Sequence, residues 1–62
     1  MNLTPVSKNT ISRTFDVAGI PADMSDYDLE NEVARLSRLA FIFDVKVESR
    51  NGSTARVTVI TD

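Results

Sequence analysis

The chain has 62 residues, of which 42% are hydrophobic and 26% are charged, and its formal net charge is −2. This length predicts a single domain near the lower size limit for independent folding, and the composition is that of a globular protein rather than a disordered one. Because the sequence contains neither Cys nor His, disulfides and the usual zinc sites are excluded. These limits favour self-association or docking on a larger partner.

The N-terminal third of the chain is expected to contain one strand. Residues 1–9 show no hydrophobic period and include Pro5, so they are expected to form a flexible arm outside a domain of residues 10–62. Residues 10–17 alternate between apolar and polar side chains, with Ile11, Phe15 and Val17 on one face. This alternation predicts a half-buried strand.

A helix is expected over about residues 26–41. Ser25 has the position of an N-cap, whose side-chain oxygen accepts a hydrogen bond from an unpaired backbone N–H of the first turn. Apolar residues then recur at the spacing of one helix face, and these residues are Leu29, Val33, Leu36 and Ala40.

Six acidic residues and no basic residue lie between Arg13 and Arg35: Asp16, Asp23, Asp26, Asp28, Glu30 and Glu32. In one interpretation they form an acidic surface that contacts a basic partner or mimics a polyanion. In the other, carboxylates gather near the beginning of a helix because the macrodipole favours them there. The sequence leaves both interpretations open.

The dipeptide Asn51-Gly52 predicts a hairpin between a strand that starts near residue 43 and a strand over residues 54–60. The apolar residues of these strands alternate with polar ones, so they share the face that packs on the core. The residues expected on this face are Phe43, Val45, Val47, Ala55, Val57 and Val59.

The register of this hairpin is open between two possibilities. A loop over residues 50–52 is favoured because it places Val45 opposite Val57 and keeps apolar residues on one face. A shift of the loop by one residue pairs Glu48 with Arg56, but it puts a residue other than Gly at the left-handed position.

These elements predict an α+β fold in β-α-β-β order, with a three-stranded, mostly antiparallel sheet and one helix packed on one face. Strand 54–60 is expected in the centre, which leaves the other two strands as edges. The order and length resemble those of the dodecins, which are small flavin-binding oligomers, but their flavin-stacking Trp has no counterpart in a chain without Trp. We expect no cofactor and no small-molecule ligand.

Catalytic and metal sites are not expected from the acidic residues. Asp26, Asp28 and Glu30 alternate as in a calcium loop, but the Gly that such a loop requires at its sixth position is replaced by Asn31. On a helix, residues two apart point away from each other, so these carboxylates could not converge on one ion. With no His or Cys to act as base or nucleophile, the chain is expected not to be an enzyme.

Nucleic-acid binding is kept as the alternative function. The predicted hairpin contains Lys46, Arg50 and Arg56, which could contact phosphates. Binders of single strands usually add aromatic side chains on which bases stack, whereas Phe15 and Phe43 are both expected to point into the core. The alternative is therefore a nucleic-acid-linked regulator, which binds through the basic hairpin or blocks a DNA-binding protein with its acidic end.

A second apolar stripe offers a surface for a protein partner. Tyr27, Ala34 and Phe41 recur at seven-residue spacing on the helix, away from the core stripe, and Ile42 follows them. In one interpretation these residues bind a partner or a second copy; in the other the helix ends near residue 40, and Phe41 and Ile42 turn into the core. The candidate partner-binding residues are Tyr27, Ala34, Phe41, Ile42, Asp23 and Asp26.

The favoured function is a small non-enzymatic protein-interaction module, an adaptor or inhibitor that is dimeric or bound to a larger protein. It is expected to bind through an exposed strand edge or through Tyr27, Phe41 and Ile42. The longest apolar run, Leu39–Phe43, is far shorter than the roughly 20 residues that span a bilayer. No basic stretch followed by an apolar stretch marks a signal peptide at the N-terminus. We therefore expect a soluble cytoplasmic protein that contacts no membrane.

Overall fold

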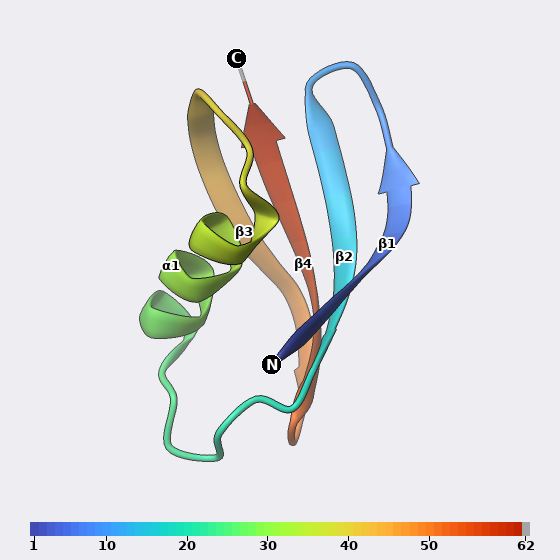
Figure 1. Ribbon diagram of the computed structural model, residues 1–62. Helices are drawn as coiled ribbons and strands as arrows, with labels where there is room; N and C mark the ends of the chain where they lie inside the picture. The colour runs from blue at the N-terminus through green and yellow to red at the C-terminus, as the bar shows by residue number, and fades with distance from the viewer. Residues whose placement is uncertain (62) are drawn as a thin grey trace.

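The computed structural model describes residues 1–61 and contains one helix and four strands (Figure 1). In chain order these are β1 (Asn2–Lys8), β2 (Ser12–Ala18), α1 (Asp26–Ser37), β3 (Ile42–Asn51) and β4 (Thr54–Thr61). The strands form one antiparallel sheet of order β1-β2-β4-β3, with α1 packed on one face. The α+β class is confirmed, and so is the central position of the last strand between its two neighbours.

The number of strands and their order were predicted incorrectly. The segment expected to be a flexible arm forms β1, which pairs with β2 and places Leu3 opposite Val17. The order is therefore β-β-α-β-β, not β-α-β-β, and β2 lies inside the sheet rather than at its edge. Pro5 is compatible with β1 because an edge strand needs no hydrogen bond from the N–H that proline lacks.

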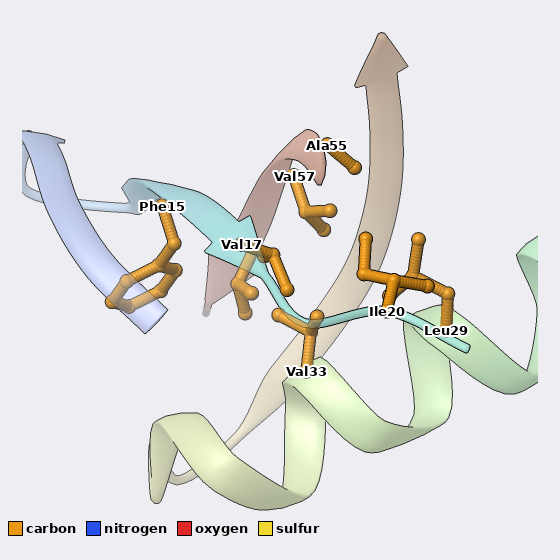
Figure 2. Close-up of a cluster of buried hydrophobic side chains, with 8 residues drawn as sticks. Phe15, Val17, Ile20, Leu29, Val33, Ala55 and Val57 are labelled. Atoms are coloured by element: carbon orange, nitrogen blue, oxygen red, sulfur yellow. The ribbon is translucent and has the colours of Figure 1, made fainter. Parts of the chain in front are cut away.

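The core lies between α1 and the sheet (Figure 2). Leu29 and Val33 of the helix are fully buried against residues from the two central strands. Eight residues form this cluster: Phe15, Val17, Ile20, Leu29, Val33, Ala55, Val57 and Val59. The predicted core faces of the helix, of β2 and of β4 thus pack together, but Ile11 and Ala40, which were predicted on these faces, are exposed.

The helix begins where the sequence predicts and ends earlier. The Ser25 hydroxyl accepts a hydrogen bond from the Asp28 N–H at 3.1 Å, as an N-cap does. The helix ends at Ser37 because Arg38 takes a left-handed backbone with φ 57°. Within residues 1–61, no helix is long and apolar enough to cross a membrane.

The register of the hairpin differs from the favoured one. Asn51 pairs with Thr54 around the two-residue loop Gly52-Ser53, with Gly52 at φ 64°, so the loop over residues 50–52 is wrong. Further along the strands Val47 pairs with Val57, as in the shifted register. A β-bulge at Glu48 joins the two registers, because one extra residue on β3 shifts the pairing without exchanging the faces.

A second bulge in β3 changes the position of Phe43. The register shifts between Ile42 and Asp44, while Ile42 and Val45 both pack against the core. The two residues between them, Phe43 and Asp44, therefore share the outer side. The prediction that Phe43 lies in the core is wrong.

Candidate protein-interaction surface

The structure separates the residues of the predicted helical stripe. Tyr27 is 73% exposed in the first turn of α1, and Ala34 is half-buried in the middle of the helix. Phe41 lies beyond the left-handed Arg38 and outside the helix. Because the helix ends four residues before Phe41, these three residues do not form a continuous stripe.

Phe41 and Ile42 were expected either to bind a partner together or to turn into the core together, and the structure separates them. Ile42 packs against the core from the beginning of β3, as expected from the interpretation in which this residue turns into the core. Phe41 is 81% exposed and has a left-handed backbone with φ 57°. Phe41 thus remains available to a partner, whereas Ile42 contributes to folding.

Asp26 connects the beginning of the helix to the hairpin. Its carboxylate accepts a hydrogen bond from the Arg50 guanidinium at 2.9 Å, and Arg50 also donates to the Pro21 carbonyl at 3.4 Å. Arg50 pairs with Ala55 in the sheet, so its side chain extends over the core side and only 21% of it is exposed. Asp23, three residues earlier, is exposed in the loop.

Two further acidic residues of the predicted block have basic partners within the chain. Asp16 pairs with Arg56 across β2 and β4 at 3.0 Å, and this hydrogen bond raises the pKa of Arg56. Glu32 pairs with Arg35 at 2.8 Å, and the hydrogen bond from Arg35 lowers the pKa of Glu32. Half of the acidic block therefore neutralises the chain's own bases, which weakens its interpretation as a polyanion mimic.

The outer face of the sheet, opposite α1, is polar and internally bonded. The hydroxyls of Thr14 and Thr58 form a hydrogen bond of 3.0 Å beside the Asp16–Arg56 pair. In the part of the chain that the structure describes, each buried side-chain polar atom has a partner. Residues 1–61 also contain no group of three potential ligands placed to hold a metal ion.

Three exposed apolar residues lie at one end of the sheet instead. Ile42 pairs with Thr61, and the Thr61 N–H donates to the Ile11 carbonyl at 2.6 Å. The residues before and after Ile42 therefore lie across β4 from Ile11, at the end of the sheet where the β1–β2 turn lies (Figure 1). We call Ile11, Phe41 and Phe43 the apolar end; their exposed fractions are 58%, 81% and 79%.

The apolar end adjoins the free edge of β3. β3 is an edge strand of the sheet, and its two bulges leave a regular stretch over residues 44–47. Val45 and Val47 are only half-buried although they pack against the core. The sides of Val45 and Val47 that face away from β4 are therefore open to a neighbouring strand.

Sequence reasoning missed Phe43, although the sequence contains a signal. Phe41, Ile42 and Phe43 are consecutive apolar residues, and successive side chains of a strand point to opposite faces. Not all three could enter the core. Either Ile42 or the two Phe residues had to remain outside, and the second alternative, which the structure adopts, places two aromatic rings in solvent.

Comparisons of the chain with protein-family models, with curated proteins and with solved structures gave no match.

Proposed function

We propose that the protein is a small non-enzymatic protein-interaction module, which binds its partner through the apolar end and the adjoining edge of β3. The observation that carries this proposal is the exposure of Phe41 and Phe43, each about four-fifths in solvent. Burying a Phe side chain contributes about 1.5–3 kcal/mol, and aromatic residues are enriched in the parts of interfaces that contribute most to binding.

We further propose that the module acts in the cytoplasm as an adaptor or inhibitor, bound to a second copy or to a larger protein. A chain of this size has a small core, so an interface that covers two exposed rings would add substantially to its stability. Tyr27 and Asp23, at the other end of α1, are available as secondary contacts.

The experiment is a comparison of complexes recovered from the native cell with tagged protein. The wild type is compared with a Phe41→Ser, Phe43→Ser variant, and the control is a Val6→Ser variant, which also loses an exposed apolar side chain but lies outside the proposed surface. The first variant is expected to lose its partner and the control to keep it, with both retaining the wild-type circular dichroism spectrum. Equal recovery by the two variants would exclude the apolar end as the binding surface.

One observation favours the alternative of a nucleic-acid-linked regulator. Exposed Phe41 and Phe43 provide aromatic rings on which bases could stack, and Lys46 lies on the same strand as Phe43. Against it, Arg50 and Arg56 of the basic hairpin are already paired with Asp26 and Asp16. Titration with a single-stranded oligonucleotide at low salt, where phosphate contacts are strongest, tests direct binding; an absence of binding there would exclude the form of this alternative that binds through the basic hairpin.

A further inference from the structure

We infer that the partner of the β3 edge is a second copy of this chain, with the two β3 strands antiparallel and Val45 on the two-fold axis. The inference rests on the proposed function and specifies its partner. In this arrangement each residue i of one β3 faces residue 90 − i of the other, so the two sheets join into one of eight strands. Three properties of β3 lead to this register.

The first property is the direction of the backbone amides. The Val45 N–H donates to the carboxylate of its own neighbour, Asp44, at 2.9 Å, and therefore lies on the free side of the strand rather than in the ladder with β4. Since amide directions alternate along a strand, the Val47 N–H also points outward. When the Val45 N–H leaves its own Asp44 carboxylate, Val45 can exchange two hydrogen bonds with Val45 of the second copy, and Asp44 is released to pair with Lys46.

The second property is the alternation of charge. Asp44, Lys46 and Glu48 carry charges of alternating sign on the outer side of the edge strand, and neither Asp44 nor Lys46 has an ion pair within residues 1–61. With Val45 on the axis, Asp44 of each copy faces Lys46 of the second copy, so two opposite-charge pairs form. With Lys46 on the axis, Lys46 would face Lys46 and Asp44 would face Glu48, which are like-charge pairs.

The third property is the length of the regular edge. Bulges at Phe43 and Glu48 bound the stretch that can accept a neighbouring strand. Pairing centred on Val45 places residues 44–46 of the two copies opposite one another and lies between the two bulges. It also covers the half-buried outer sides of Val45 and Val47, and a two-fold axis closes the assembly so that no further copy adds to this edge.

Cysteine substitutions test the register, because the chain has no Cys of its own. The Cα atoms of a hydrogen-bonded antiparallel pair lie about 5.5 Å apart, within the range of disulfides. Val45→Cys is therefore expected to oxidise to a covalent dimer about tenfold faster than Lys46→Cys or Val47→Cys. Fastest cross-linking by Val47→Cys or Lys46→Cys would overturn the register.

Charge exchange tests the same pairing on exposed side chains, where the fold is not at risk. Asp44→Lys and Lys46→Asp are each expected to weaken self-association about tenfold, whereas the double variant and an equimolar mixture of the two single variants restore it. Glu30→Lys, on the helix, is the control that changes charge away from the edge. Failure of the mixture to associate would overturn the pairing of Asp44 with Lys46.

Sedimentation equilibrium over a range of concentrations separates this inference from the proposed function. The wild type is expected to shift from monomer to dimer as its concentration rises. A wild type that remains monomeric, while Phe41→Ser, Phe43→Ser still loses a cellular partner, would overturn the second copy and leave the interaction module standing. A dimer that the Phe variant forms as well as the wild type would confirm the edge as the contact between copies and exclude the apolar end from that contact.

Discussion

Two residues with left-handed backbones turn the chain from α1 into β3. Arg38 caps the helix with φ 57°, and Phe41 has the same φ just before the strand. A left-handed conformation costs a non-Gly residue about 1–2 kcal/mol. Phe41 gains little in return, since its side chain is exposed. The aromatic ring at this position is therefore better explained by binding than by folding.

Phe41→Gly is expected to raise the free energy of unfolding by about 0.5–1 kcal/mol, because Gly adopts the left-handed region without steric cost. Arg38→Gly is the matched control, since it relieves a similar backbone away from the apolar end. Urea unfolding measures both variants, and capture of the partner is expected to fall only for Phe41→Gly. A loss of stability in Phe41→Gly would show that the ring contributes to the fold.

The Glu32–Arg35 pair predicts a local pH dependence. The hydrogen bond from Arg35 lowers the pKa of Glu32 below its ordinary value of 4.5, so the pair stabilises the folded state above that value. Its contribution is lost as the pH falls through the lowered pKa. Titration by NMR is expected to show the low pKa of Glu32 in the wild type and an ordinary one in Arg35→Gln; equal values would contradict the pairing in solution.

At the scale of elements, β-bulges determine what the sheet edges present. β1 has one bulge, at Val6, and β3 has two, at Phe43 and Glu48. Bulges at sheet edges interrupt the row of free backbone groups and limit uncontrolled pairing with other strands. The bulge at Glu48 has a second effect, because it keeps Val47 and Arg50 on the core side although the register changes between them.

Deleting Glu48 is expected to leave the fold intact, since Ser49 would follow Val47 in regular alternation with the same partners on β4. Deleting Lys46 instead would move Val45 to the outer face, because the side-chain period of a strand is two. Thermal unfolding is expected to be cooperative for the Glu48 deletion and to lose its cooperativity for the Lys46 deletion. The Glu48 deletion also lengthens the regular edge, so its self-association should be stronger than that of the wild type; equal stability of the two deletions would contradict the role of the bulge.

At the scale of the whole molecule, the N-terminal segment is part of the domain. Leu3 and Met1 pack against the core, and β1 covers the edge of β2 that would otherwise be free. The Met1 backbone also lies close to Gly19, whose φ is 74°. A domain of this size has few other residues with which to replace that burial.

Leu3→Ala is expected to lower the free energy of unfolding by about 1–2 kcal/mol, because it removes a partly buried side chain from the core. Thr4→Ala, on the outer face of the same strand, should change it by less than about 0.5 kcal/mol. Removal of residues 1–8 is expected to abolish cooperative unfolding. If all three changes had small effects in urea, the segment would be the loose arm that its sequence suggests.

Local signals predicted most of the fold and little of the candidate surface. The N-cap at Ser25, the apolar stripe through Leu29 and the turn at Gly52 depend on near neighbours in the chain, and each is present in the structure, although the favoured hairpin loop and the end of the helix were predicted incorrectly. β1 gave no such signal because Pro5 and the bulge at Val6 disturb its alternation. Its conformation depends on pairing with β2, which no local pattern reveals.

The candidate surface depended on where two elements end. The stripe of Tyr27, Ala34 and Phe41 assumes a helix that continues to residue 41, and the left-handed Arg38 ends it first. Arg is an ordinary helix former, so its sequence position gave no reason to expect this end. Phe43 was assigned to the core because strict alternation was assumed through a strand that contains two bulges.

The acidic residues between Arg13 and Arg35 show what the sequence determines and what the tertiary structure decides. By itself the sequence determined where the helix begins and which faces of α1, β2 and β4 are buried, because caps and hydrophobic periods act over a few residues. Only the tertiary structure decided that Asp16, Asp26 and Glu32 pair with the chain's own arginines, and that Phe41 and Phe43 remain in solvent. Ion pairs across strands and bulges in a sheet depend on the register of distant segments, and that register is set by packing of the whole molecule.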